Sequence, residues 1–315
     1  MRTRSIGSLQ VTVVGIGCNN FGRQLDADAT REIVHAALDH GIAFFDTADS
    51  YGDPKTMSET VLGPILKPHR DRIVLATKFG RVIDETRRGA KASYVRAATE
   101  ASLKRLQTDY IDLMQLHIPD PTTPIEETLG ALGELIKEGK IREIGGSNFT
   151  APELREMSDA AKAHGTPRFV STQAEFSLLH REPVADLIAE CVRSDIRFLP
   201  FRPLFNGLLT GKYRPGAPPP TEGRIGAKSA QAQAKILSTS NLATVAALTE
   251  YAEARGHTML ELAIGWVLGH DFVPSVIAGV SSPRQVASNA AAAAWELTSS
   301  EMAEVGELLE ANACA

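Results

Sequence analysis

The stretch from Glu143 to Ala163 reads EIGGSNFTAPELREMSDAAKA and contains the unit from which we expect the fold to be built. Its first part, Glu143 to Asn148, is a short strand-like run, and Ala151 to Ala163 has a helical pattern. Strand-like runs and helical patterns alternate in the same way along the rest of the chain. This alternation predicts parallel βαβ units.

Eight strand–helix units in 315 residues fit a closed (β/α)8 TIM barrel better than an open sheet. Several runs are apolar almost throughout, as expected of a parallel sheet covered on both faces. Residues 5–11 resemble a short hairpin before the barrel. The predicted strands are 13–18, 43–48, 73–79, 111–117, 143–148, 170–176, 196–201 and 275–280. The predicted helices are 28–40, 93–106, 124–138, 151–163, 183–194, 241–255, 259–269 and 300–310.

One segment interrupts the alternation. Residues 206–240 contain no clear strand and include Pro215, Pro218, Pro219 and Pro220. A long irregular segment in a compact domain is usually functional or disordered. We expect one domain over residues 1–315, with the extra length in this segment.

Composition narrows the function. Lys plus Arg is 33 and Asp plus Glu is 38, so the net charge of −5 argues against a nucleic-acid footprint at the level of the whole chain. No apolar run is long enough to cross a bilayer or to form a signal peptide. Cys18, Cys191 and Cys314 lack metal-ligand spacing. We expect a cytoplasmic protein with no metal site, no nucleic-acid partner and no membrane partner.

Polar residues stand where the predicted strands end. Asp46 ends the second strand, Lys78 the third and His117 the fourth, and Tyr51 follows Asp46 by five residues. Each residue alone has a structural explanation, as a turn residue, an outward-pointing lysine or a buried histidine. Catalytic residues of α/β barrels collect at these strand ends. Their joint placement therefore favours one common site.

These four residue types suit proton transfer. A buried Lys78 requires a counter-charge, which Asp46 can supply. An ammonium beside a phenol favours its ionised form, so Tyr51 is expected to give or take a proton near neutral pH. His117 can orient a substrate oxygen. No nucleophile motif accompanies the set, which suggests that a bound cofactor supplies a hydride.

Five motifs in order carry a family resemblance. They are FFDTADSYG at 44–52, DYIDLMQLH at 109–117, GKIREIGGSNF at 139–149, GLLTGKY at 207–213 and SSPRQV at 281–286. Over nearly the whole chain the sequence resembles the aldo-keto reductase family. The resemblance implies a (β/α)8 barrel that binds NADPH and reduces an aldehyde or ketone to an alcohol. It implies Tyr51 as general acid, tuned by Lys78 and Asp46, with His117 orienting the carbonyl.

The resemblance also implies a cofactor site. Ser147, Asn148 and Gln173 would hold the nicotinamide carboxamide, and Phe201 would stack on the ring. Where the family has Tyr-Ser-Pro-Leu, this chain has Phe-Arg-Pro-Leu, and we expect Arg202 to face the cofactor phosphates or the pocket rim. The full set of expected cofactor contacts is Ser147, Asn148, Gln173, Phe201, Arg202, Pro203, Leu204, Gly207, Lys212, Arg224, Gly279, Ser281, Arg284, Gln285 and Asn289.

The residues around 279–283 support a phosphate site on their own. A strand end, a small turn and a helix start present backbone N–H groups to an anion. Lys212 and Arg224 are expected to clamp the pyrophosphate, which makes the segment after the seventh strand a cofactor-covering loop. Arg284 or Gln285 is expected at the 2′-phosphate. No acidic residue is placed to pair the ribose hydroxyls of NAD, so NADPH is favoured over NADH.

Alternatives remain for the function. Tyr51 and Lys55 have the spacing of a short-chain dehydrogenase pair, but Gly52 and Pro54 make this stretch a loop, so we reject that assignment. A cofactor-bound regulatory subunit of the same fold and a sugar dehydrogenase working in the oxidative direction stay open. The expected partner is a small-molecule carbonyl substrate, and the oligomeric state is undetermined. The predicted substrate pocket adds Asn20, Phe21 and Phe79 to Tyr51 and His117.

Overall fold

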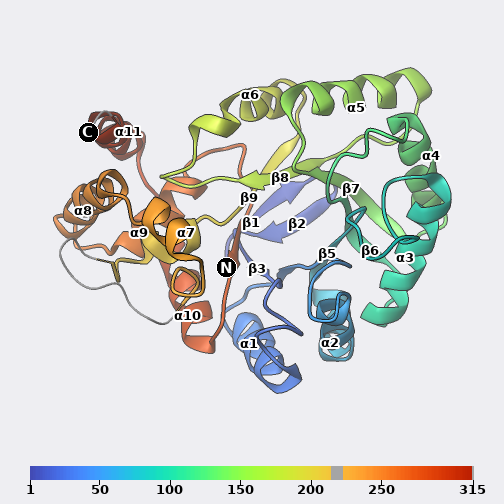
Figure 1. Ribbon diagram of the computed structural model, residues 1–315, viewed down its shortest axis with the longest axis horizontal. Coiled ribbons are helices and arrows are strands. Elements are labelled where there is room, and N and C mark those ends of the chain that lie inside the picture. Colours follow the sequence, from blue (N-terminus) through green and yellow to red (C-terminus); the bar gives the residue numbers. More distant parts are fainter. Residues whose placement is uncertain (214–222, 314–315) are drawn as a thin grey trace.

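The computed structural model describes residues 1–213 and 223–313. Eight parallel strands close into a barrel in the order β10-β3-β4-β5-β6-β7-β8-β9, surrounded by helices (Figure 1). The predicted (β/α)8 barrel is therefore confirmed, and each barrel strand overlaps one of the eight predicted runs. The strands are β3 (Val14–Gly17), β4 (Phe44–Asp46), β5 (Val74–Phe79), β6 (Ile111–Leu116), β7 (Ile141–Ser147), β8 (Ser171–Glu175), β9 (Arg197–Phe201) and β10 (Val276–Gly279).

The helices lie outside the barrel and follow the strands along the chain (Figure 1). They are α1 (Ala27–Asp39), α2 (Met57–Leu66), α3 (Ala92–Leu106), α4 (Ile125–Lys137), α5 (Ala151–His164), α6 (Ala185–Arg193), α7 (Ala230–Ile236), α8 (Thr239–Glu253), α9 (Met259–Leu268), α10 (Pro283–Ala292) and α11 (Ser299–Ala313). Short 3₁₀ turns add Lys67–Arg72, Glu182–Val184 and Phe205–Thr210.

The predicted hairpin is also confirmed and closes one end of the barrel. β1 (Thr3–Ile6) and β2 (Leu9–Thr12) pair antiparallel. Their side chains Ile6 and Leu9 are buried in one cluster with Phe44, which begins β4. A plug at the N-terminal end leaves the C-terminal strand ends as the open mouth, which is where polar residues are predicted.

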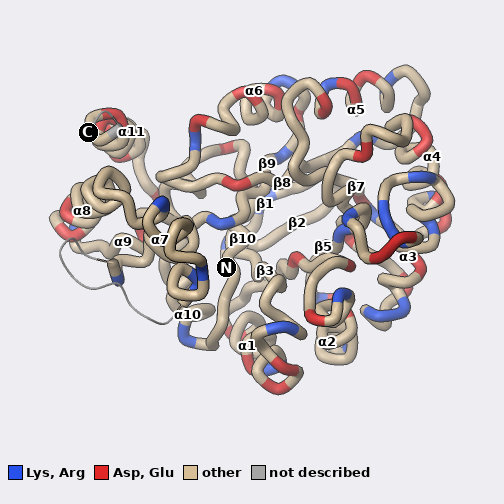
Figure 2. The backbone as a smooth tube through the Cα atoms, in the orientation of Figure 1, with Lys and Arg blue, Asp and Glu red and all other residues tan. Residues whose placement is uncertain are grey.

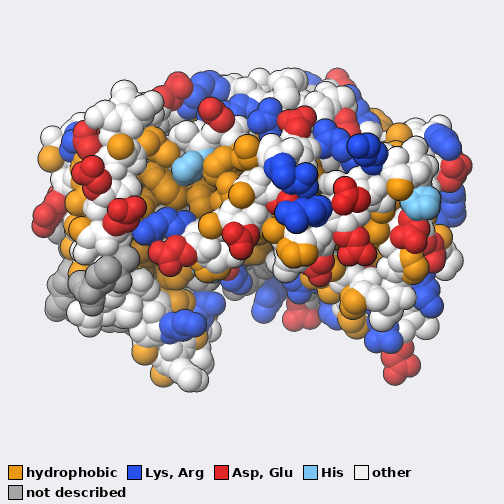
Figure 3. Space-filling view, turned by 90° about the horizontal axis from the view of Figure 1, so that it is seen from above, with side chains coloured by type: hydrophobic (Ala, Val, Ile, Leu, Met, Phe, Trp, Pro, Cys, Tyr) orange, Lys and Arg blue, Asp and Glu red, His pale blue; other side chains and the backbone are white. Residues whose placement is uncertain are grey.

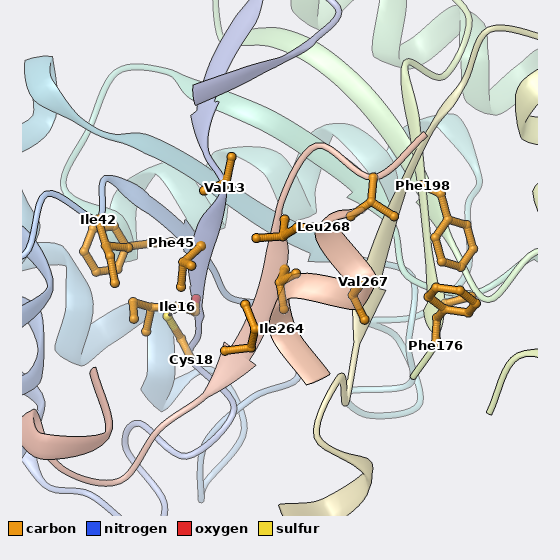
Figure 4. Packing of buried hydrophobic residues seen from close by; sticks show 14 of the residues in the cluster. Val13, Ile16, Cys18, Ile42, Phe45, Phe176, Phe198, Ile264, Val267 and Leu268 are labelled. Carbon is orange, nitrogen blue, oxygen red and sulfur yellow. Dashed lines mark hydrogen bonds between the residues drawn. The ribbon is translucent and has the colours of Figure 1, made fainter. Parts of the chain in front are cut away.

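The main core fills the layer between strands and helices. Ile16 of β3 and Phe45 of β4 are fully buried there (Figure 4). Phe176 and Phe198 pack edge to face, with ring centroids 5.7 Å apart. Each such side chain contributes roughly 1.5–3 kcal/mol through burial. This layer holds the strand ends in fixed positions.

Helix starts follow the local capping rules. Ser282 caps α10 and accepts a hydrogen bond from the Gln285 backbone, with Pro283 as the first helical residue, as predicted. Thr150 caps α5 in a capping box with Glu153. The predicted start of α4 at residue 124 is one residue too early, because Pro124 is the N-cap and Ile125 is the first helical residue.

Two elements lie where no helix is predicted. α2 follows the Tyr51 loop and carries Pro64 and Gly63, which weaken a helical pattern. The segment 206–240 is not irregular throughout, because α7 lies in it with Ser229 as its cap. The cluster of prolines from Pro215 to Pro220, like Cys314, lies outside the described residues.

Charges are mixed over the surface. Both signs occur along α3, α5 and α6, whereas α8 and α11 carry only acidic side chains (Figure 2), and both signs are interspersed on the face shown in Figure 3. Among the described helices, none is long and apolar enough to pass through a bilayer.

Candidate active site

The C-terminal ends of the barrel strands open into a cavity of about 1290 Å³. This volume exceeds the roughly 300–1,000 Å³ of common small-molecule pockets. Many of the predicted site residues share this one space although they come from separate strands and loops. Those that line it are Asp46, Tyr51, His117, Ser147, Asn148, Gln173, Phe201, Arg202, Arg224 and Gly279.

A buried ion pair lies at the floor of the site. Lys78 is fully buried, and its Nζ donates to Asp46 Oδ2 at 2.6 Å and to the Thr47 carbonyl at 2.9 Å. The other carboxylate oxygen, Oδ1, accepts from Gln115 Nε2 at 3.0 Å and from Gln173 Nε2 at 3.1 Å. Partners from β5, β6 and β8 therefore fix the carboxylate on β4 in one orientation.

The Tyr51 ring lies next to both this pair and His117. Lys78 Nζ is 5.1 Å from the centroid of the Tyr51 ring. The rings of Tyr51 and His117 meet edge to face at 5.7 Å between centroids. Ser50 Oγ lies 3.3 Å from His117 Nδ1. The structure thus brings the four predicted catalytic residues into one cluster.

The electrostatics indicate the charge of two members of the cluster, Lys78 and His117. Burial disfavours the charge on Lys78, but the Asp46 carboxylate and Tyr51 outweigh it and raise the pKa of Lys78. Burial, and then the charges of Lys78 and Arg81, lower the pKa of His117 to about 2. The site therefore combines a charged ammonium with a neutral imidazole near pH 7. A neutral imidazole has one N–H donor, which can point at a carbonyl oxygen.

The predicted carboxamide-binding residues form a second group. Asn148 has a left-handed backbone with φ of 61°, and its Nδ2 donates to the His117 carbonyl at 2.9 Å and to Ser147 Oγ at 3.0 Å. Its backbone N–H donates to the Gln173 carbonyl. Asparagine tolerates this conformation better than most residues. The ends of β7 and β8 are therefore locked to the end of β6.

The unusual Arg202 lies at the cavity rim in an ion pair. Its Nη1 is 2.7 Å from Glu175 Oε2, and its guanidinium carbon lies 5.8 Å from the centroid of the Phe201 ring. Its φ of 53° is strained for a residue with a side chain, and Asn206 has a φ of 60°. Pro203 and Leu204 lie between these two strained positions, where they begin the turn after β9.

Arg202, Arg224 and Gly279 line the cavity, but the other residues predicted to meet the phosphates, namely Gly207, Lys212, Ser281, Arg284 and Gln285, are not part of its lining. Ser281 donates its backbone N–H to Gln285 Oε1 at 2.8 Å, so this glutamine amide already has a partner. Arg284 is exposed on the first turn of α10, and Asn289 is buried on the same helix. The Lys212 ammonium lies against the backbone of Gly207 and Gly223.

A buried atom without a partner supports the fit of an extended ligand. Asn206 Oδ1 is buried and has no hydrogen-bond partner among the described residues, and Asn206 lines the cavity. A buried polar atom of this kind is stabilised when a bound group donates to it. Arg202 and Arg224 line the same space and suit a dinucleotide phosphate.

The three residues predicted to complete the substrate pocket are not part of the cavity lining. Phe21 and Phe79 are fully buried in the hydrophobic core, so they do not reach the cavity. Asn20 does not line it either, because its amide donates to the Val280 carbonyl at 3.2 Å and ties the β3 loop to the end of β10. Cys18 does belong to the cavity lining, but its side chain is fully buried, and burial raises the pKa of its thiol well above the usual range.

Several lining or supporting residues are absent from the sequence-based set. Gln115 stands two residues before His117 on β6, and the two-residue period of a strand could have indicated it. Ser50 precedes Tyr51 in the same motif. Asn19 and Arg81 line the cavity from loops after β3 and β5, and no local pattern marks them.

The chain is similar to known proteins over most of its length. The model of the Aldo/keto reductase family matches residues 13–310. A relative from Bacillus subtilis (strain 168), "Aldo-keto reductase YhdN", is 32% identical over 311 residues, which cover 96% of this chain and 91% of the relative. "L-glyceraldehyde 3-phosphate reductase" of Escherichia coli (strain K12) is 31% identical over 290 residues, 89% of this chain and 84% of the relative. A "Probable voltage-gated potassium channel subunit beta" of Arabidopsis thaliana is 31% identical over 298 residues, 92% of this chain and 90% of that protein.

Proposed function

The chain belongs to the aldo/keto reductase family of oxidoreductases, and from that premise we propose that it reduces an aldehyde or ketone to an alcohol with NADPH. The observation that carries the proposal is the cluster of Tyr51, His117 and the buried Lys78–Asp46 pair at the open end of the barrel. A hydroxyl held beside a fixed charge can donate a proton to a carbonyl oxygen.

Residues around the cavity would hold the cofactor. Ser147, Asn148 and Gln173 offer polar groups to the nicotinamide end, and Phe201 offers an aromatic face. Arg202 and Arg224 would meet the phosphates, with Lys212 and the start of α10 beyond them. When bound, the reduced nicotinamide supplies a hydride to the carbonyl carbon.

The protein's own residues supply the proton. The Tyr51 hydroxyl donates it to the carbonyl oxygen as that oxygen gains negative charge, and the Lys78 ammonium stabilises the phenolate that remains. Asp46 keeps Lys78 charged and in place through the 2.6 Å contact. The neutral His117 donates one hydrogen bond to the same carbonyl oxygen and orients it toward Tyr51.

The preference for NADPH rests on basic residues near the predicted phosphate site. Arg284 is exposed on the first turn of α10, where its guanidinium can meet a 2′-phosphate, and the Oε1 of the neighbouring Gln285 accepts from Ser281. We therefore expect a lower KM for NADPH than for NADH. Replacement of Arg284 by Ala should bring the KM values for NADPH and NADH closer together. A lower KM for NADH than for NADPH in the unmodified enzyme would contradict the proposed preference for NADPH.

The decisive experiment is turnover of a panel of carbonyl compounds by the unmodified protein and by Tyr51→Phe. We expect Tyr51→Phe to lower kcat at least ~10²-fold, because the general acid is lost. NADPH binding, followed by fluorescence titration, should stay within about twofold. Unchanged turnover would remove Tyr51 from the mechanism.

The same panel separates the rival functions. Tight NADPH binding without turnover of any carbonyl would favour a regulatory subunit, a role that the name of the Arabidopsis relative suggests. Faster oxidation of a sugar with NADP⁺ than reduction of any carbonyl would favour a sugar dehydrogenase. The reductase names of the two bacterial relatives support the reductive direction.

A further inference from the structure

A cationic side chain, Arg81, lines the cavity far from the predicted phosphate-binding loops. It follows β5, and in the closed order of the barrel β5 and β6 stand across the mouth from β9 and β10. The arginines and the lysine expected to meet the cofactor phosphates follow β9 and β10. One extended dinucleotide with its phosphates over β9 and β10 does not place a phosphate at Arg81. An anionic group that binds the Arg81 guanidinium therefore belongs to the substrate and not to the cofactor.

The loop that carries Arg81 is held in a defined conformation. Lys55 Nζ, from the loop after β4, donates to the Val82 carbonyl at 2.7 Å and to the Ile83 carbonyl at 3.1 Å. At the other end of the loop, the Ala90 N–H donates to Asp120 Oδ2 at 2.8 Å. A guanidinium presented from an anchored backbone loses less conformational freedom when it binds an anion.

Arg81 has no carboxylate within salt-bridge distance among residues 1–213 and 223–313. Arg23 and Arg224, which line the same cavity, also lack such a partner among the described residues, whereas two other arginines have one. Arg87, on the same loop, pairs with Asp84 at 2.7 Å, and Arg202 on the opposite rim pairs with Glu175 at 2.7 Å. A guanidinium in a cavity without an internal counter-charge favours an anionic ligand, which it can bind through two parallel hydrogen bonds.

The space beside Arg81 also has an apolar wall. Val82, Ile118 and Phe149 line the same cavity, and Val82 is 51% exposed although it is apolar. Tyr51 and His117, whose rings meet edge to face, line the same cavity. Arg81 also contributes to the low pKa of His117, which places its charge within electrostatic reach of that ring.

We infer that the natural substrate is an anionic carbonyl compound, whose aldehyde or ketone oxygen meets Tyr51 and His117 while a carboxylate or phosphate at its other end binds Arg81. This inference rests on the proposed reductase function. The spacer between the two groups contacts the wall formed by Val82, Ile118 and Phe149.

The experiment compares substrates that differ only in charge. One pair is 4-carboxybenzaldehyde and its methyl ester, and the other is glycolaldehyde phosphate and glycolaldehyde. For the unmodified enzyme we expect kcat/KM for the anionic member to exceed that of the neutral member by at least ~10-fold. The excess should shrink as NaCl rises, since the contact is partly exposed to solvent. If only 4-carboxybenzaldehyde is preferred over its neutral counterpart, the anionic group of the natural substrate is a carboxylate. If only glycolaldehyde phosphate is preferred, that group is a phosphate.

Two variants on one loop test the residue. The test quantity is kcat/KM for the anionic substrate divided by kcat/KM for its neutral counterpart. This ratio should fall about tenfold in Arg81→Gln, and it should fall less in Arg81→Lys, which keeps the positive charge. Arg87→Gln removes an equal charge from the same loop at a residue that does not line the cavity, and it should leave the ratio unchanged.

Equal kcat/KM for the charged and neutral members of both pairs would overturn the inference and leave the reductase function intact, since both would still be reduced. An unchanged ratio in Arg81→Gln would overturn it as well. If no aldehyde is reduced, the proposed function fails, and calorimetry then tests the anion site alone. Binding of 4-carboxybenzaldehyde at least ~10-fold tighter than its ester, lost in Arg81→Gln, would still support the site, and equal binding would refute it.

Discussion

Two aspartates three residues apart, Asp46 and Asp49, show how differently this protein treats the same side chain. Both are about 2% exposed. Asp46 is paired with Lys78, and both of its oxygens accept hydrogen bonds. Asp49 Oδ1 has no hydrogen-bond partner among the described residues. Burial alone therefore does not decide whether a carboxylate is charged.

The surroundings of Asp49 favour its neutral form. Burial, and then the nearby Glu59 carboxylate, raise the pKa of Asp49 to about 8. Glu59 itself is fully buried and engaged by Arg105 at 2.7 Å and by Thr77 at 2.5 Å. The Arg105 guanidinium is therefore paired with Glu59 and not with Asp49. The contrast teaches that a partner with opposite charge, held at hydrogen-bond distance, makes the difference between a charged and a neutral buried acid.

The largest effect is expected from Asp46→Asn, which leaves the Lys78 ammonium buried without a counter-charge. Removing one member of a buried ion pair costs roughly 3–5 kcal/mol. We expect urea unfolding at pH 7 to show a loss of this order, and kcat to fall ~10²-fold as Lys78 loses its position beside Tyr51. The double variant Asp46→Asn/Lys78→Met should recover much of the stability and none of the activity. If Asp46→Asn is as stable as the unmodified protein, the Asp46–Lys78 ion pair does not stabilise the site.

The same substitution at the other aspartate should act in the opposite direction. The folded state holds the Asp49 proton more tightly than the unfolded chain, whose pKa is about 3.9. Folded protein then binds more protons between about pH 4 and pH 8, so its stability falls as pH rises through this range. We expect Asp49→Asn to remove this pH dependence and to raise Tm at pH 8 by several degrees. Near pH 4 the two proteins should unfold alike. A lower Tm at pH 8 would mean that Asp49 is charged and stabilised in the fold.

The smallest effect tests the neighbour of Asp49. Glu59→Gln removes a negative charge but also weakens the contact with Arg105. We expect the pH at which the Asp49 contribution is lost to shift down by about one unit. The measurement is thermal unfolding from pH 4 to pH 9, with Asp49→Asn/Glu59→Gln as the control that should show no such shift. An unchanged midpoint would leave burial as the only cause of the raised pKa.

Much of the fold follows from local pattern. The period of apolar residues and the cap at Ser282 depend on nearby residues, and patterns of this kind predict eight strands and most helices. Local pattern does not predict α2, which contains Pro64, or α7, which is only 7 residues long. Their helical structure depends on tertiary packing.

The site is only partly predictable for a related reason. Asp46, Lys78 and His117 lie at or next to the ends of successive strands, and the barrel geometry implies that strand ends meet. Phe21 and Phe79 also lie near strand ends, yet they point into the core. Near a strand end, the inward or outward direction of a side chain depends on the exact strand boundary, which pattern alone does not supply.

By itself the sequence determined the barrel, the acidic but mixed charge and the residue types of the candidate site, because these depend on periodicity and on motifs within short stretches. Only the tertiary structure decided the ion pair of Asp46 with Lys78, the raised pKa of Asp49 and the position of Arg81 across the mouth from the phosphate loops. Gln173 reaches Asp46 from 127 residues away along the chain. The charge state of a buried group depends on contacts of this kind, which form only when the barrel closes.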